Sequence, residues 1–347
     1  MRKWLPYVEG LILVLVVFMI FLYAKRNPPE NTPPAASQAQ SLVQKADALF
    51  EAEDLAPALV AYWDAVRAIQ SADDTDAGEL LLHAHLRISE IYYHSNWVED
   101  AEAHLEKANA IQPEYPPIHL LRGKIKRDTG EPAEAVTAFL TVLEIDPTNA
   151  EAHYQLGILY QGTKQYQQAI SHYQKAIEAD TDLKRAPFES VPVGLQARLQ
   201  LSRTYRRILQ DYQFIDRELT QKEQTELAEF EKKGIAMLEE VVKLNPNYSE
   251  AKDELIGLLF GQAAALGRSG EERFYDEALT VYEKIVALDP NEIDAWKWIG
   301  QIHESFLQDP EEALKAYKKT GGPTLASRTA GIVLTSPFSQ RLEEGSP

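Results

Sequence analysis

The sequence predicts an all-α protein: a right-handed α-α superhelical solenoid of about seven helix pairs, preceded by one N-terminal transmembrane helix. Three observations lead to this prediction. Small and apolar residues recur every 34 residues, much of the chain has apolar residues three and four apart, and the N-terminus carries a long apolar stretch. One helix pair cannot bury its apolar face alone, so stacked pairs must share a continuous core.

Composition narrows the classes of function. The chain has 347 residues, with 45% hydrophobic and 25% charged residues, as is normal for a folded protein. Its net charge of −18 disfavours nucleic acid as a partner, because nucleic-acid binding normally needs a basic surface. There is no cysteine, which excludes disulfides, thiol catalysis and cysteine-based zinc sites.

The N-terminal stretch predicts a membrane anchor. Gly10 to Ala24 contains no charge, and adding residues 4–9 gives 21 residues, close to the roughly 20 that span a bilayer. Basic residues flank both ends of this stretch. We therefore expect residues 1–26 to form a transmembrane anchor with its flanks. Residues 27–40, which contain four prolines, should form a Pro-rich spacer.

A cleaved signal peptide is the alternative, but the apolar stretch runs directly into Lys25 and Arg26 without a small-residue cleavage site. Two basic residues on each side nearly balance the positive-inside rule. The short N-terminal tail favours a cytoplasmic N-terminus. The expected localisation is a single-pass membrane protein, in the manner of the bacterial inner membrane, whose soluble domain is extracytoplasmic (periplasmic) rather than cytoplasmic.

The repeat is clearest between residues 82 and 181. Four kinds of position recur there at steps of 34: small residues at Ser89, Gly123 and Gly157; alanines at Ala101, Ala135 and Ala169; large apolar residues at Leu105, Phe139 and Tyr173; and prolines at Pro113 and Pro147. Four independent positions in one register predict a true structural repeat.

These residues resemble the tetratricopeptide repeat, a 34-residue helix–turn–helix unit. The best match is residues 150–180, where the family's positions are filled by Leu156, Gly157, Tyr160, Ala169, Tyr173 and Ala176. Thr181 departs from the family's closing proline. The resemblance implies a solenoid over residues 41–322, with a concave groove that binds extended peptides.

The remaining units follow in order along the chain. Residues 40–66 form a first unit, after which an acidic insertion intervenes before the three regular units. Beyond residue 200 three irregular units carry insertions, and Thr220 with Glu223 forms a capping box that begins a long helix. Gly321 and Gly322 end the last unit, and residues 323–347 are expected to form a capping helix and tail.

His85, His119 and His153 also lie 34 residues apart, which raises a metal site as an alternative. Consecutive first helices must stand about 8–10 Å apart. Zinc requires nitrogen ligands at about 2 Å, so one ion cannot join two of these residues. We therefore expect packing histidines. The same periodicity predicts that Tyr160 and Tyr173 are packing residues.

The resemblance also implies which residues line the groove. The expected peptide-binding residues are Tyr93, Lys124, Arg127, Tyr154, Ile158, Gln161, Leu199, Arg203, Arg206 and Arg207, with Leu86, Glu90 and Leu120 beside them. Their cations would form a local basic patch suited to an acidic peptide or a carboxylate. The alternative is that these cations pair with glutamates of neighbouring units or face solvent.

Motifs for catalysis and for cofactor binding are missing: there is no GxSxG, P-loop, HExxH or glycine-rich dinucleotide loop. We expect no enzyme activity and no cofactor or metal. The predicted function is a membrane-anchored scaffold or adaptor that docks a protein or peptide partner to assemble a membrane or envelope complex. The alternatives are a self-associating, homo-oligomeric solenoid and an accessory subunit of an envelope enzyme or secretion system. Arg203→Glu with Arg206→Glu is expected to abolish partner capture without unfolding the protein.

Overall fold

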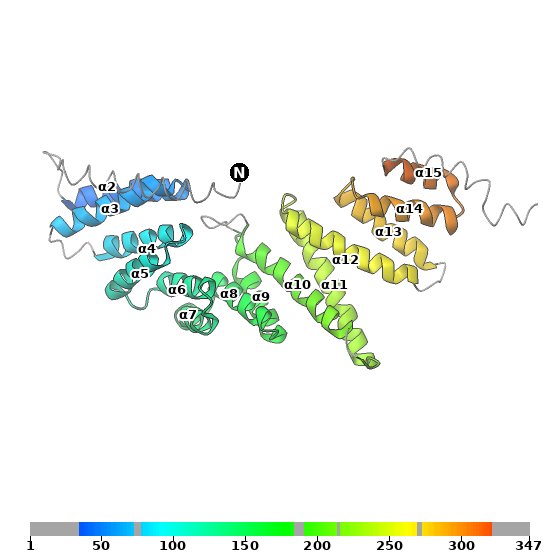
Figure 1. Cartoon of the computed structure of the whole chain (residues 1–347), viewed down its shortest axis with the longest axis horizontal. Coiled ribbons are helices and arrows are strands. Elements are labelled where there is room, and N and C mark those ends of the chain that lie inside the picture. The colour runs from blue at the N-terminus through cyan, green and yellow to red at the C-terminus, as the bar shows by residue number, and fades with distance from the viewer. Residues whose placement is uncertain (1–34, 73–77, 184–190, 214–215, 269–272, 321–347) are drawn as a thin grey trace, which may run out of the picture. The chain divides into compact units, whose positions relative to one another are not determined.

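The computed structural model describes residues 35–72, 78–183, 191–213, 216–268 and 273–320. In these ranges the chain forms 14 α-helices and no strand (Figure 1). The helices follow one another as seven consecutive pairs, so the prediction of an all-helical solenoid is confirmed. Its right-handedness stays a prediction.

The pairs are numbered 1 to 7 along the chain, and each has a first and a second helix. They are α2 (Ala35–Glu51) with α3 (Leu55–Ala72), α4 (Gly78–His94) with α5 (Val98–Ile111), α6 (Pro116–Asp128) with α7 (Pro132–Ile145), α8 (Ala150–Gly162) with α9 (Tyr166–Ala179), α10 (Val193–Gln213) with α11 (Gln221–Leu244), α12 (Ser249–Arg268) with α13 (Arg273–Leu288), and α14 (Ile293–Ser305) with α15 (Pro310–Lys319).

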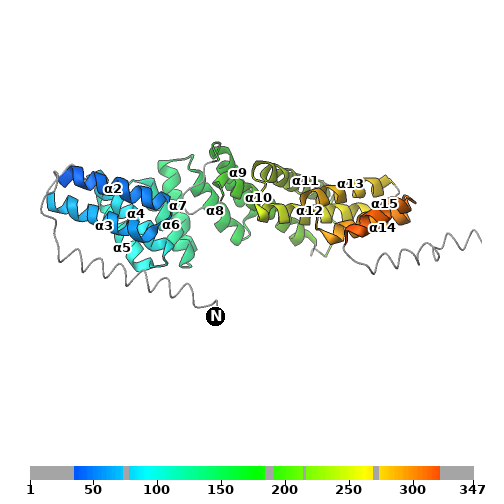
Figure 2. The same cartoon turned by 90° about the horizontal axis from the view of Figure 1, so that it is seen from above.

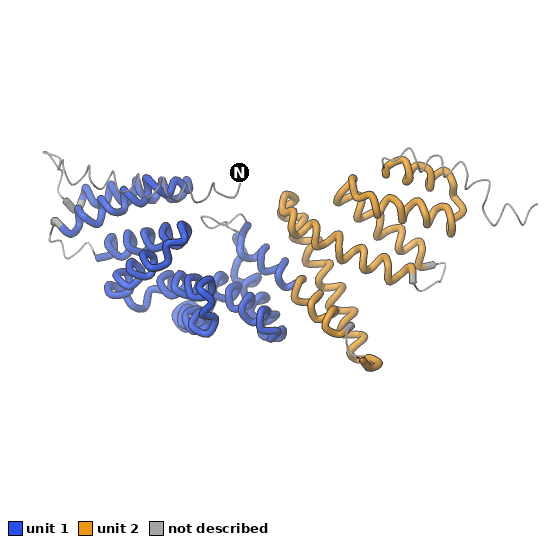
Figure 3. Tube along the Cα trace, in the orientation of Figure 1, with its two compact units in different colours: residues 1–201 blue, residues 202–347 orange. Residues whose placement is uncertain are grey.

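The chain divides into two compact units, residues 1–201 and residues 202–347, and the boundary falls within α10 (Figure 3). Within each unit the second helix of a pair also packs on the first helix of the next pair, as α3 does on α4 and α13 on α14 (Figure 2). Helices are therefore buried on two sides, which explains why most core residues come from the interior faces of both helices of a pair.

Side chains fix several helix starts. The Asn149 side chain accepts a hydrogen bond from the Ala152 backbone amide at the start of α8. At the start of α11, Thr220 and Glu223 form a complete capping box, which confirms the capping box predicted from the sequence. Each cap satisfies backbone N–H groups that the first turn of a helix leaves unpaired.

A recurring turn joins the helices of the first four pairs. Glu53, Asn96, Gly130 and Lys164 all adopt a positive φ, between 59° and 84°. Only glycine adopts this left-handed conformation without a steric cost from Cβ. Asparagine enters this region more readily than other non-glycine residues, so Glu53 and Lys164 are the two positions where the turn residue itself disfavours the turn.

The first helices carry a small slot, held by Ala46, Ser89, Gly123, Gly157, Ser202 and Gly300 in pairs 1 to 5 and 7. Where the slot is glycine, an aromatic ring from the second helix lies against it. A Cβ on Gly123 would lie 2.5 Å from the Phe139 ring, and one on Gly157 would lie 2.5 Å from the Tyr173 ring. Gly300 faces Tyr317 in the same way.

Serine fills the small slot where the second helix offers leucine in place of an aromatic ring. In pair 2, Ser89 Oγ donates to the Ala101 carbonyl at 2.7 Å, and Leu105 holds the facing position. In pair 5, Ser202 Oγ donates to the Gly234 carbonyl at 3.2 Å. The smaller leucine leaves room for a hydroxyl, which then bonds across the two helices. In these pairs the size of the residue in the small slot thus fits the size of the side chain that faces it.

The predicted localisation needs correction. A single-pass membrane protein is contradicted by the structure, because none of the helices it describes is both long and apolar enough to cross a bilayer. α11, with 24 residues, has the length, but charged residues recur along it. The stretch that carried the prediction, residues 1–26, lies outside the described residues.

Two other predicted segments, the spacer at 27–40 and the capping helix and tail at 323–347, lie partly or wholly outside the described residues. α2 begins at Ala35, so residues 35–40 of the expected spacer at 27–40 are helical. The expected capping helix and tail at 323–347 lie outside the described residues.

Candidate functional site: the first-helix face

The predicted binding residues lie on one face of the first helices, here called the first-helix face. In residues 1–201 this face comes from α4, α6, α8 and the start of α10. Consecutive first helices approach each other directly, as α4 does α6 and α6 does α8. Side chains on this face can therefore reach from one pair to the next.

Between pairs 3 and 4 the face is a chain of polar contacts. Lys124 Nζ lies 3.1 Å from Glu151 Oε1, which also accepts a hydrogen bond from the Gln155 amide at 2.7 Å. The Arg127 guanidinium donates to Gln155 Oε1. The two cations predicted to form a basic patch in α6 are thus directed at the next first helix.

Asp128 links this chain of contacts to pair 2. Its carboxylate accepts from Arg127 Nε at 2.7 Å and from the Tyr93 hydroxyl at 2.6 Å. Partial burial would raise the pKa of the Asp128 carboxyl, but the hydrogen bonds from Arg127 and Tyr93 lower it below its ordinary value. Asp128 therefore stays ionised and neutralises Arg127.

In residues 202–347 the predicted arginines are also paired. Arg203 contacts Glu250 at 3.3 Å and Glu254 at 3.4 Å, and Arg206 Nε lies 3.0 Å from Glu254 Oε1. The Glu254 side chain is only 7% exposed, so its charge depends on these two cations. Arg207 is exposed, and no carboxylate in the described part of the chain pairs with it.

These contacts repeat with a fixed register. One rung joins the residue after the small slot to a residue of the next first helix: Asp47 to His83 at 2.7 Å, Lys124 to Glu151, and Arg203 to Glu250. A second rung starts from the residue four positions after the small slot. Its partner lies on the next first helix, one helical turn after the partner in the first rung. Its members are Phe50 to Arg87, Arg127 to Gln155, Gln161 to the Gln200 carbonyl, and Arg206 to Glu254. We call this set the first-helix ladder.

A pocket of about 260 Å³ opens at the ends of α4 and α6. It is lined by Tyr93, His94, Asn96, Val98, Ile125, Asp128 and Thr129. Tyr93 was predicted from the repeat register. The other lining residues were not, because they lie at helix ends and in the turn after α4, where the register of the first helices gives no signal.

Three stretches of the chain match models of a known repeat family. Models described as TPR repeat and tetratricopeptide repeat match residues 123–164, 150–182 and 270–325. The chain contains tetratricopeptide repeats. The matched residues include most of pair 3, pair 4, the second helix of pair 6 and pair 7, and the predicted resemblance is confirmed there.

Two curated proteins are similar to part of this chain. One is the human protein O-mannosyl-transferase TMTC3, 28% identical over 97 residues. The other is the anaphase-promoting complex subunit CDC16 of Saccharomyces cerevisiae, 33% identical over 94 residues. The aligned part spans 28% and 25% of this chain, and 11% of each relative.

Three solved structures are among those similar to this chain. The C-terminal part of a TPR repeat-containing protein from Cytophaga hutchinsonii has a TM-score of 0.48 at 16% identity, covering 80% of this chain and 93% of that one. PilW, a type IV pilus biogenesis factor, has a TM-score of 0.44 at 17% identity, covering 80% and 97%. YrrB, described with an unusual peptide-binding site, has a TM-score of 0.40 at 19% identity, covering 62% and 90%.

The structure changes how the predicted groove residues are interpreted. Lys124, Arg203 and Arg206 pair with glutamates of the next helix pair, which is the alternative that the sequence left open. Leu199 is fully buried, and Tyr154 and Gln161 are nearly so. Ile158 and Tyr93 remain half-buried, and Arg207 is exposed. Whether these residues bind a partner stays a prediction.

Of the three histidines that lie 34 residues apart, His85 and His153 are buried packing residues, and His119 is half-buried. Their ring nitrogens also have a defined role. His119 Nε2 lies 2.7 Å from the Pro113 carbonyl and His153 Nε2 3.1 Å from the Pro147 carbonyl. Trp296 Nε1 donates to the Pro290 carbonyl at 2.9 Å in the same position. A carbonyl only accepts, so both histidines carry the proton on Nε2.

Sequence reasoning missed the partners of two histidines. His85 Nδ1 lies 3.1 Å from His104 Nδ1 in pair 2, and His153 Nδ1 lies 3.0 Å from His172 Nδ1 in pair 4. Because His153 is protonated on Nε2, the shared hydrogen of its pair is donated by His172. The spacing of 19 residues within both pairs was the available signal.

The expected outcome of Arg203→Glu with Arg206→Glu now changes. The double variant places two new carboxylates against Glu250 and the nearly buried Glu254. We expect a loss of about 1–2 kcal/mol in the free energy of unfolding, since buried charge would lose its partners. Chemical denaturation would measure it, with Arg207→Glu on the same helix as the control that should change little. Equal stability of the double variant and the control would contradict the ladder.

Proposed function

We propose that the chain is a non-catalytic scaffold that binds a protein or peptide segment on the first-helix face of residues 1–201. One observation supports this most: Leu120 and Ile158 stay half-buried on that face, between rungs whose polar groups already have partners. An apolar side chain of a partner can cover them without stripping an unpaired charge of water.

The chemistry of the partner follows from the charges of this face. Lys124 and Arg127 are balanced by Glu151 and Asp128, so an acidic segment would have to compete with internal carboxylates. A neutral, extended segment with apolar side chains meets no such competition. Its end can enter the pocket beside Tyr93, where the Asp128 carboxylate accepts from Arg127 and Tyr93 and has a lone pair left for one more N–H donor.

Absence of catalysis is part of the proposal. The titratable groups of this face are engaged in the ladder, and His85 and His153 are buried against neighbouring helices. A general base must reach the proton it removes, and these side chains are covered by packing. Assembly with a partner is therefore the activity that the arrangement favours.

A displayed random-peptide library tests the proposal. We expect the wild-type chain to enrich apolar, weakly charged peptides. Leu120→Glu with Ile158→Glu should bind them at least about 10-fold more weakly, as losses at central contacts do. Leu140→Glu, on the second helix α7 at 40% exposure, is the matched control and should keep binding. Enriched peptides that bind all three chains equally would refute the site, and enrichment of acidic peptides would refute the predicted chemistry.

A further inference from the structure

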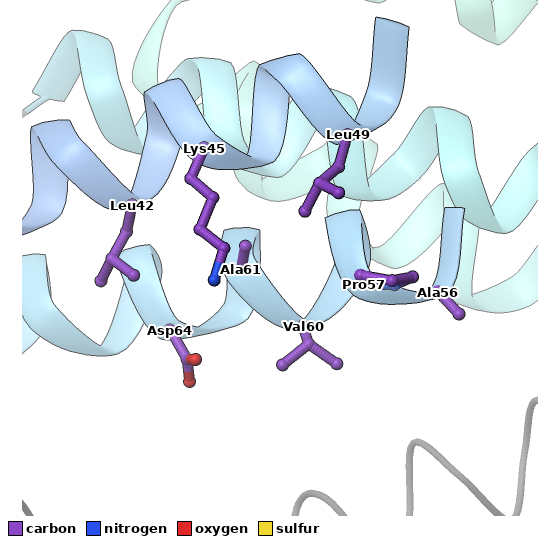
Figure 4. A pocket seen from close by; sticks show the side chains of 8 residues that line it. All are labelled: Leu42, Lys45, Leu49, Ala56, Pro57, Val60, Ala61 and Asp64. Atoms are coloured by element: carbon purple, nitrogen blue, oxygen red, sulfur yellow. The ribbon is translucent and has the colours of Figure 1, made fainter. Parts of the chain in front are cut away.

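A second surface lies at the outer side of pair 1, away from α4. α2 and α3 enclose an apolar groove of about 270 Å³ there, lined by Leu42, Lys45 and Leu49 of α2 and by Ala56, Pro57, Val60, Ala61 and Asp64 of α3. Figure 4 shows the α2 side chains directed across the groove towards α3. Among the described helices, only α2 and α3 line this groove.

The same groove exists in pair 2, where it is filled. Pairs 1 and 2 register at a constant offset of 43 residues, as Ala46 with Ser89 and Ala58 with Ala101 show. By this offset Leu42, Leu49, Ala61 and Asp64 correspond to His85, Tyr92, His104 and Lys107. Each lining residue of the open groove therefore has a counterpart whose surroundings are known.

Trp63 of α3 fills the groove of pair 2. Its ring centroid lies 5.0 Å from that of His104, and its indole Nε1 donates to the Tyr92 hydroxyl at 3.4 Å. Lys107 Nζ lies 5.9 Å from the ring centroid on the open side. Three of the four counterpart residues thus contact one tryptophan from the preceding second helix, and the fourth, His85, packs on His104 at 5.0 Å.

The open groove is also adapted to a larger occupant. Leu42, Leu49 and Ala61 stand where pair 2 has the rings of His85, Tyr92 and His104, so smaller side chains line the groove of pair 1. An empty apolar groove loses packing contacts on every lining atom, and a large aromatic side chain restores them. At the rim Asp64, which pairs with Arg67 of the same helix, replaces Lys107, so the charge at this position is reversed between the two pairs.

A second copy of the chain fits this groove poorly. The position of Trp63 in the other described second helices is held by Glu106, Leu140, Gln174, Glu239, Glu283 and Lys318. None is aromatic, and five of the six are charged or polar. End-to-end stacking of two chains would therefore place no aromatic anchor in the groove. This disfavours end-to-end stacking of two copies and favours an occupant from another protein.

We propose that the groove between α2 and α3 is a docking site for an amphipathic helix of a partner protein, anchored by a tryptophan that lies as Trp63 lies in pair 2. This surface is distinct from the first-helix face. The chain would then hold a helix at its first pair and an extended segment on its first-helix face.

The test uses α3 itself as the probe, because α3 already fills the equivalent groove of pair 2. A synthetic peptide of Leu55–Ala72 is titrated against the full chain. The chain has no cysteine, so Val60→Cys takes a single bimane label beside the groove. Bimane is quenched by contact with tryptophan. We expect saturable quenching by the peptide, and at least about 30-fold weaker binding of the peptide that carries Trp63→Ala. An isolated helix of this length is marginally stable, so the titration extends to millimolar peptide.

Two variants and one control make the outcome decisive. Leu42→Asp, which places a charge in the groove, and Ala61→Phe, which fills it, should both abolish quenching while thermal unfolding shows a folded chain. Bimane at Ala103→Cys, the counterpart of Val60 in the occupied groove, should not respond. Absence of saturable quenching, or equal binding by the Trp63→Ala peptide, overturns the proposal. Concentration-dependent self-association of the wild type that Leu42→Asp removes would assign the groove to a second copy and also overturn it.

Discussion

Gly157→Ser is expected to lower the free energy of unfolding by about 2–3 kcal/mol. A Cβ at this position would lie 2.5 Å from Cε1 and 2.6 Å from Cδ1 of Tyr173, and the Tyr173 side chain is fully buried. The ring has no free volume into which it can move, so both helices must shift, and overpacking a core costs about 1–3 kcal/mol. The better helix propensity of serine offsets only about 0.5 kcal/mol of this.

Tyr173→Leu should partly rescue Gly157→Ser. The double variant reproduces the combination of pairs 2 and 5, where serine faces leucine and its hydroxyl donates to a carbonyl of the second helix. We expect the double variant to be more stable than the sum of the two single losses predicts, by at least about 1 kcal/mol. Urea denaturation of the four chains of this cycle measures the coupling.

Gly162→Ser is the matched control for this cycle. Gly162 also lies in α8, but a Cβ there would meet nothing within 4 Å. It should therefore leave stability nearly unchanged. Additive losses in the Gly157 and Tyr173 cycle would show that the glycine-with-aromatic and serine-with-leucine combinations arose without a steric reason.

Acidification should destabilise residues 1–201 through the two histidine pairs. Burial, then Lys107, lowers the pKa of His85 to about 4, and burial, then Lys107 and His85, lowers that of His104 to about 3. In pair 4, burial, then His153 and Lys175, lowers the pKa of His172 to about 4. Each pair shares one hydrogen between two Nδ1 atoms, so a second proton there would break the contact.

The direction of the effect follows from proton binding. An unfolded histidine titrates near pH 6.5, so between about pH 6.5 and pH 4 the unfolded chain binds more protons than the folded chain. Stability is therefore fully present above pH 6.5 and is lost as the pH falls towards 4. A single histidine whose pKa falls from 6.5 to about 4 accounts for about 3 kcal/mol of this loss, of which about 1.4 kcal/mol appears by pH 5.5.

Urea denaturation between pH 7.5 and pH 5.5 tests this, at a safe distance from the isoelectric point of about 4.9. The matched variant is His104→Ala with His172→Ala. Pair 3 already has this arrangement, because Ala138 stands opposite His119. The variant loses packing at every pH, but its stability should fall less steeply on acidification. Parallel pH profiles for the wild type and the variant would refute the role of the histidine pairs.

The helix pairs could be predicted because their determinants are local and periodic. Gly157, Ala169 and Tyr173 recur at 34 residues with their counterparts, and each fills a contact between the two helices of one pair. The capping box at Thr220 is equally local. The start of α2 at Ala35 was not predicted, since alanine and glutamine in the expected spacer continue the helix without a boundary signal.

The candidate site could be predicted only in position. Register placed Lys124, Arg203 and Arg206 on the first-helix face, but their charge partners Glu151, Glu250 and Glu254 lie some 27 to 51 residues further along the chain. Pairing across that distance depends on how consecutive first helices approach, which no single unit encodes. The groove of pair 1 was missed for a similar reason: leucine and alanine are unremarkable until the Trp63 contacts of pair 2 reveal what the equivalent space holds.

The contacts of the first-helix ladder depend on the order of the helix pairs along the chain. A rung works only when each unit is followed by its own complement. Deleting residues 150–194 would bring Gln196 opposite Lys124 in place of Glu151, so Lys124 would lose the carboxylate that it now contacts. The helix pairs of this chain are therefore not interchangeable. Duplication or loss of a unit would have to be followed by matching substitutions in the neighbour, so the sequence of rungs records the order in which the array is built.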